Sequence, residues 1–175
     1  MNLEFDIKLQ EKDLFRFNMY HSYHKAGTWV FTFIGLAILV ISFTTMDEIT
    51  ANYTMLYWAC SLLLIFYTPI NLKTTAKLRM RQNNSLSKTL HYVFSDEGIR
   101  VSFAETENEE DAERAAETVV AWNELYRLIE TKTQILIYTS RINASVLPKA
   151  QIEGMDTLRE LFKKNLEPHR LTLKK

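Results

Sequence analysis

Two long stretches without a charged residue constrain this chain more than any other feature of its sequence. The first covers residues 26–46, AGTWVFTFIGLAILVISFTTM, and the second covers residues 49–72. A bilayer core about 30 Å thick requires roughly 20 apolar residues in a helix, and both stretches are long enough. Backbone amides in lipid must bond within their own segment, so both stretches are predicted to be helices. We therefore predict a transmembrane hairpin over residues 26–72, with spans at 26–46 and 52–70.

Basic residues on the outer sides of this hairpin predict its orientation. They precede the first stretch and follow the second: Arg16, Lys25, Lys73, Lys77, Arg79 and Arg81. The connecting loop carries only Asp47 and Glu48. Because positive flanks stay in the cytoplasm, both termini are predicted to be cytoplasmic in a multi-pass protein. The alternative is a pair of buried helices in a soluble protein, although such helices rarely run this long without a charge.

Residues 73–88, KTTAKLRMRQNNSLSK, are predicted to form a basic juxtamembrane linker. Lys73, Lys77, Arg79 and Arg81 are candidates for contact with lipid headgroups, because an anionic surface attracts each basic residue by about 1 kcal/mol. The competing interpretation is that these charges only set the topology.

The remaining segments predict an α+β protein. Within residues 1–25, apolar and charged residues alternate from Leu3 to Leu9, which predicts a strand, and a helix follows. Alternating segments after residue 88 predict about six further short strands. In the turn Asp96-Glu97-Gly98, Gly98 is expected to supply a positive φ angle. Apolar residues at helical spacing then predict an amphipathic C-terminal helix that closes an antiparallel sheet.

The order of these segments resembles the YcxB-like family of bacterial membrane proteins. The matching motifs are the hairpin around DEGI, then VVAWNELYRLIET, TQILIYTS and VLPK, with Gly98, Trp122, Pro148 and Lys149 as signature residues. The resemblance implies that residues 89–168 form a YcxB-like domain with a pleckstrin-homology-like fold, at the membrane of a bacterial cell. It implies no activity. Trp122 is expected to pack across the sheet, and Pro148 is expected to end an edge strand.

The sequence carries no motif that specifies a reaction. Lys and Arg together equal Asp and Glu at 21 each, and zero net charge argues against general nucleic-acid binding. The four glycines lie far apart, which excludes a phosphate-binding loop. His21 and His24 have no acidic or cysteine partner at ligand spacing, so no metal site and no cofactor are expected. The acidic run at residues 105–117 is expected to be a solvated loop.

These observations predict a membrane-anchored, non-enzymatic interaction or regulatory module at the cytoplasmic face. Its expected partners are the lipid bilayer and a protein not identified by the sequence, and a homo-oligomer stays open. The alternative is an accessory subunit that binds a transporter or sensor through its membrane helices. A third hypothesis, an enzyme or transporter in its own right, would require a pocket with converging ionisable groups.

Overall fold

A computed structural model describes the chain except for residues 1, 25, 46–50, 104–117 and 175. The predicted acidic loop at residues 105–117 therefore lies outside the described residues. The chain divides into two compact units. One, here called the β unit, combines residues 1–13 with residues 83–175, and the other, the helical unit, comprises residues 14–82.

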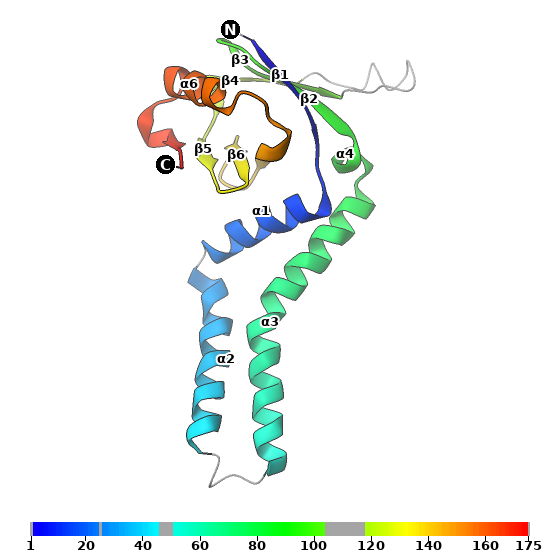
Figure 1. Ribbon diagram of the computed structural model, residues 1–175, viewed down its shortest axis with the longest axis vertical. Helices are drawn as coiled ribbons and strands as arrows, with labels where there is room; N and C mark the ends of the chain where they lie inside the picture. The colour runs from blue at the N-terminus through cyan, green and yellow to red at the C-terminus, as the bar shows by residue number, and fades with distance from the viewer. Residues whose placement is uncertain (1, 25, 46–50, 104–117, 175) are drawn as a thin grey trace. The chain divides into compact units, whose positions relative to one another are not determined.

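The helical unit consists of the greater part of one short helix and two long helices. Their bounds are Glu11–Tyr23 for α1, which begins in the β unit, Ala26–Thr44 for α2 and Ala51–Gln82 for α3. Helices α2 and α3 lie side by side (Figure 1). At Gly35 an added Cβ would lie 2.9 Å from the carbonyl oxygen of Ser61, so glycine is needed at this close approach of the two helices.

Helix α3 extends well beyond the predicted span and takes up most of the predicted linker. It continues without a break to Gln82, because Lys77 to Gln82 are all good helix formers and basic residues in the last turn favour the helix dipole. Pro69 therefore lies inside the helix and not at its end. A proline lacks the N–H that would bond to the carbonyl four residues earlier, and helices bend at such positions. Figure 1 shows that the basic end of α3 leans away from α2.

The β unit contains two four-stranded sheets, where the sequence predicted a single curved sheet. The first has the order β1-β2-β3-β4, formed by Leu3–Lys8, Thr89–Phe94, Gly98–Phe103 and Thr118–Ala121. The second has the order β7-β6-β5-β8, formed by Ala144–Pro148, Gln134–Tyr138, Arg127–Glu130 and Leu171–Thr172. All neighbouring strands are antiparallel except β5 and β8, which are parallel.

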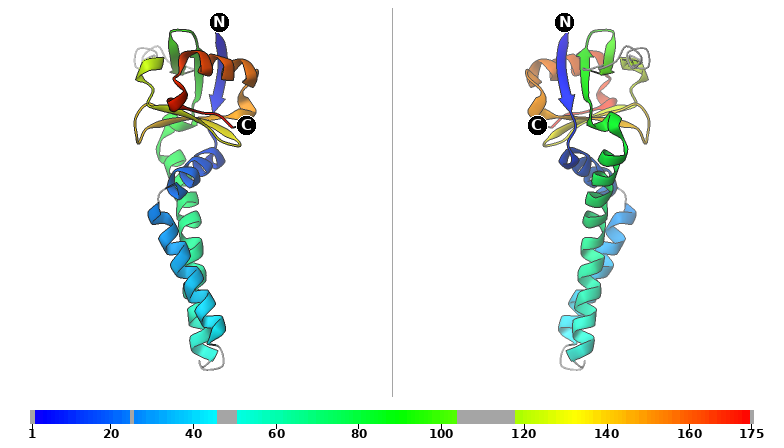
Figure 2. Two further views of the ribbon diagram at one scale, coloured as in Figure 1. Left: turned by 90° about the vertical axis from the view of Figure 1, so that its left-hand side faces the viewer. Right: turned by 90° about the vertical axis from the view of Figure 1, so that its right-hand side faces the viewer.

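Short helices complete the β unit. They are α4 (Asn84–Ser87), α6 (Met155–Asn165) and three 3-10 turns, η1 (Trp122–Glu124), η2 (Lys149–Gln151) and η3 (Pro168–Arg170). Figure 2 shows α6 together with both sheets. Its buried residues, Leu158, Leu161 and Phe162, join a single hydrophobic core with residues of both sheets. The ring of Phe162 lies 5.9 Å from that of Phe94 and 6.0 Å from that of Trp122.

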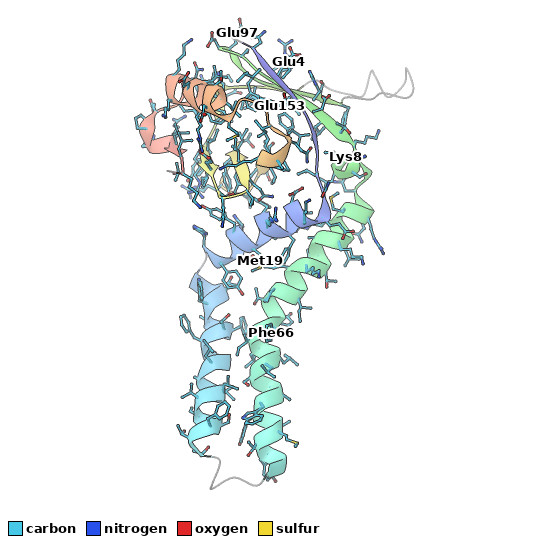
Figure 3. The ribbon with its side chains drawn as sticks, in the orientation of Figure 1. Glu4, Lys8, Met19, Phe66, Glu97 and Glu153 are labelled. Atoms are coloured by element: carbon cyan, nitrogen blue, oxygen red, sulfur yellow. The ribbon has the colours of Figure 1, made fainter. Side chains whose placement is uncertain are left out.

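Strand β1 ties the start of the chain into this core. It pairs with β2 from Leu3 opposite Phe94 to Lys8 opposite Thr89, although the whole helical unit separates the two strands in sequence. The side chain of Ile7 is 1% exposed and belongs to the core, whereas Glu4 and Lys8 point to solvent (Figure 3). The N-terminal strand is thus part of the β unit and not a separate segment.

Gly98 does not adopt the positive φ angle that the turn predicted. Among the described residues, Gly154 at the start of α6 is the glycine with positive φ, at 71°. Gly98 instead lies within β3, opposite Ala121. A Cβ at Gly98 would lie 2.5 Å from the carbonyl oxygen of Val120. The glycine is therefore required because β3 and β4 approach closely at this point.

Candidate functional site

The surface of the hairpin is the first candidate for function, because it is apolar and exposed. The candidate spans Gly27–Thr44 and Tyr53–Gln82 each contain an 18-residue window of high mean hydropathy, 2.0 and 1.5, and only 11% and 6% of the residues in these windows are buried within the chain. Large side chains such as Phe33, Leu63 and Phe66 are more than half exposed, and Figure 3 shows such side chains along both helices. The described residues therefore leave this surface without a covering partner.

Two buried hydroxyls inside the hairpin donate hydrogen bonds to carbonyls of their own helix, whereas Thr32 Oγ1 and Trp58 Nε1 have no partner among the described residues. Ser42 Oγ donates to the carbonyl of Leu39 at 2.8 Å, and Ser61 Oγ donates to the carbonyl of Trp58 at 2.9 Å. A hydroxyl that donates a hydrogen bond to a carbonyl of its own helix can lie in apolar surroundings. An apolar hollow of about 530 Å³ lies between the helices, lined by Ile38, Ile41, Ser42, Thr45, Tyr57 and Cys60.

The four basic residues predicted to contact lipid are all exposed on α3, but they do not form one patch. Lys73, Lys77 and Arg81 follow each other at intervals of four residues and therefore lie on one face of the helix. Arg79 is two residues from Lys77, which places it about 160° around the helix at 3.6 residues per turn. The structure thus divides the predicted set into a stripe of three and one opposite residue.

Trp122 and Pro148, two of the signature residues, lie in the folded interior and at the edge of a sheet, respectively. Trp122 is buried in the core, and its indole Nε1 donates to the carbonyl of Ser95 at 3.0 Å. It belongs to η1, directly after β4, and not to a strand. Pro148 ends β7, which is an edge strand, so its missing N–H removes no hydrogen bond from the interior of the sheet.

The fourth signature residue, Lys149, belongs to a buried ion cluster that sequence reasoning did not identify. Its Nζ donates to Glu130 Oε1, and Arg159 donates to the same carboxylate through Nη2 at 2.6 Å and Nε at 3.1 Å. The Glu130 side chain is only 1% exposed. Asp156, which is 94% exposed, lies on the outer side of Arg159 at 3.1 Å. The cluster joins the end of β5 to η2 and to α6.

The chemistry of this cluster favours a structural role. Both carboxylate oxygens of Glu130 accept hydrogen bonds from cations, which leaves the group poorly suited to take up a proton. Burial of the carboxyl raises its pKa, but the hydrogen bonds from Arg159 and Lys149 outweigh burial and hold the pKa of Glu130 below its ordinary value of 4.5. The carboxylate therefore stays charged at neutral pH.

This lowered pKa predicts a dependence of stability on pH. A group whose folded pKa is depressed contributes stability above its unfolded pKa, and that contribution is lost as pH falls through the folded value. We expect the difference in unfolding free energy between wild type and Glu130→Gln to be constant near pH 7 and to shrink below pH 4.5. Urea unfolding at several pH values measures it. If the difference in unfolding free energy stays constant down to about pH 2, the lowered pKa of Glu130 is contradicted.

Two open grooves lie beside Arg170, which lines both. They measure about 550 and 500 Å³. Arg170, in η3, donates through Nη1 to the carbonyls of Asn123 and Leu125 at 3.0 and 3.2 Å. These hydrogen bonds connect η3 to η1. The first groove is lined by the basic Arg127 and His169 as well as the acidic Glu124. The linings mix charges of both signs and do not specify one class of ligand.

Metal binding has no support in the part of the chain that the structure describes. No group of three or more His, Cys, Asp or Glu side chains that could hold a metal ion occurs there. Of the two histidines considered from the sequence, His24 Nδ1 lies 2.8 Å from the carbonyl of Tyr20, and His21 stacks on Phe17.

Glu130 and Arg159 are the residues that sequence reasoning missed. A signal was present for Glu130, because it is an acidic residue inside the apolar hairpin RLIETKTQILIY. Acidic residues are almost never fully buried unless they are paired with a cation. A buried Glu130 would therefore have predicted a cationic partner. No spacing rule identified Arg159, which lies 29 residues away and reaches Glu130 only through the packing of α6.

Comparison with known proteins finds one family match, which lies in the second half of the chain. Residues 94–162 match the family model described as YcxB-like protein. This segment runs from the last residue of β2 to Phe162 in α6 and contains all four signature residues. Neither a curated protein nor a solved structure matches the chain.

Proposed function

We propose that this chain, in which residues 94–162 match the family model described as YcxB-like protein, is a membrane-anchored, non-enzymatic module that presents this domain at the cytoplasmic face of a bacterial membrane. Helices α2 and α3 form the membrane anchor in this proposal. The β unit, with two sheets and an amphipathic C-terminal helix, takes the pleckstrin-homology-like role of a surface for a regulatory partner.

The observation that carries the proposal is the pairing of β1 with β2. One strand precedes the helical hairpin and the other follows it, and their side-by-side register requires residues 8 and 89 to lie on the same side of any bilayer. An even number of crossings satisfies this requirement. A single crossing would separate the two strands and expose the apolar face of β1. The sheet therefore supports a hairpin with both ends on one side.

The exposure of the hairpin supports membrane insertion over the soluble alternative. A core helix of a soluble protein would be mostly buried, but few residues of α2 and α3 are buried by the rest of the chain. Monomeric soluble proteins rarely expose apolar surface on this scale. In lipid the same side chains require no protein cover.

Cysteine labelling of the full chain in cells tests the topology. Cys60→Ala removes the single native cysteine, and single cysteines are then introduced by Asp47→Cys, Glu4→Cys and Lys174→Cys. An impermeant maleimide should label the Asp47→Cys protein on intact cells, and the other two only after the membrane is opened. Recovery of the wild-type chain in the supernatant after carbonate extraction, or labelling of Lys174→Cys on intact cells, would overturn the proposal.

The second candidate, an accessory subunit of a transporter or sensor, is favoured by the hollow between α2 and α3. Its apolar lining and its volume of about 530 Å³ would admit side chains of a partner helix. Co-purification of a second membrane protein in mild detergent, lost when α2 is exchanged for an unrelated apolar helix, would support this candidate.

A further inference from the structure

We propose that Lys73, Lys77 and Arg81 form a binding stripe for the headgroups of anionic phospholipids, and that Arg79 is not part of it. The inference rests on the proposed function, because it assumes that α3 crosses a bilayer. It specifies which of the basic residues contact lipid, and it names the phosphate of an anionic phospholipid as the ligand group.

Helical geometry brings the three residues together. At 1.5 Å per residue, eight residues separate Lys73 and Arg81 by about 12 Å along the axis, and each step of four residues turns the chain by only about 40°. The stripe is therefore narrow and continuous. All three side chains are exposed, and α3 holds them in this relation because it stays helical to Gln82.

The charges of the stripe are available for a ligand. Within the part of the chain that the structure describes, no ion pair is recorded for Lys73, Lys77 or Arg81. Lys149 and Arg159 offer a contrast, because both share the buried carboxylate of Glu130. A basic group without a protein carboxylate is the kind that binds an external phosphate.

The position of the stripe selects lipid as the partner. Lys73 directly follows the uncharged stretch that ends at Leu72, so the stripe continues the apolar surface of the same helix. Surface attraction falls off within a Debye length of about 10 Å, which matches the length of the stripe.

Paired single substitutions test this assignment on the full chain. Lys77→Gln and Arg79→Gln each remove one positive charge from the same helix, two residues apart, but from opposite faces. Native mass spectrometry from neutral detergent measures the dissociation constant of phosphatidylglycerol, with phosphatidylcholine as the zwitterionic reference. We expect Lys77→Gln to weaken phosphatidylglycerol binding about fivefold and Arg79→Gln to change it less than about 1.5-fold. Phosphatidylcholine binding should not change.

Three outcomes would overturn the stripe. An equal loss of phosphatidylglycerol affinity in Lys77→Gln and Arg79→Gln would mean that lipid responds to the total charge of the helix and not to the face that carries the stripe. Equal binding of the two lipids by the wild-type chain would mean that no headgroup site exists, and full displacement of phosphatidylglycerol by millimolar inorganic phosphate would indicate a site for free anions. Insertion of the chain into vesicles of phosphatidylcholine alone does not require the stripe. Failure of this insertion would therefore contradict the proposed membrane anchor and not the stripe.

Discussion

Replacing Ile7 by aspartate is expected to unfold the β unit, whereas replacing its neighbour Lys8 by aspartate is expected to leave it folded. Ile7 is 1% exposed and belongs to the hydrophobic core. Burial of an unpaired carboxylate costs several kcal/mol, which approaches the whole stability of a typical domain of about 5–15 kcal/mol. Lys8 points to solvent, so the same new side chain should cost less than about 1 kcal/mol there.

The fluorescence of Trp122 provides a local measurement for this pair. Trp29 and Trp58 lie in the helical unit, so Trp29→Phe and Trp58→Phe leave Trp122 as the single reporter, buried in the β unit. Urea unfolding of the full chain in detergent should show a cooperative transition for the Lys8→Asp protein and none for Ile7→Asp. Similar transitions for the two would contradict the role of β1 as an integral strand of the sheet.

Removal of Arg159 is expected to produce the second large effect. Arg159→Met takes away two of the hydrogen bonds to Glu130 and leaves the carboxylate with Lys149 alone. Breaking a buried pair costs about 3–5 kcal/mol, and the lower end applies because the Arg159 side chain is 33% exposed. The unfolding free energy at pH 7, measured by the same Trp122 reporter, should therefore fall by about 3 kcal/mol.

Two controls separate the loss of charge pairing from the loss of packing. Asp156→Asn removes the exposed partner of Arg159 and should cost less than about 0.5 kcal/mol. The triple variant Glu130→Leu, Lys149→Met and Arg159→Met removes every member of the cluster around the buried carboxylate, and its stability should return to within about 1 kcal/mol of wild type. A triple variant as unstable as Arg159→Met would show that shape, and not the unpaired charge, accounts for the loss.

The elements were largely predictable because they depend on local patterns. The absence of charge over residues 26–46 specified α2, and the alternation from Leu3 to Leu9 specified β1. Helical spacing after Met155 likewise specified α6. Element ends were less accurate, because the good helix formers from Lys77 to Gln82 extended α3 through a segment whose charge indicated a linker.

The candidate sites were predictable only in part. Exposure of Lys73, Lys77, Arg79 and Arg81 followed from their charge, but their division into a stripe and an opposite residue required the knowledge that α3 stays helical. Gly98 was identified as a required glycine for a reason that proved wrong. The turn suggested a positive φ angle, whereas the constraint is the backbone of β4 beside it.

The sequence by itself determined the local features of this protein: two helical stretches without charge, a set of short strands and an amphipathic helix at the end. Each follows from interactions between residues at most a few positions apart. Only the tertiary structure decided that β1 joins β2 across the helical unit and that Glu130 meets Lys149 and Arg159. Those partners are selected by burial of a shared core, to which residues far apart in the chain contribute together.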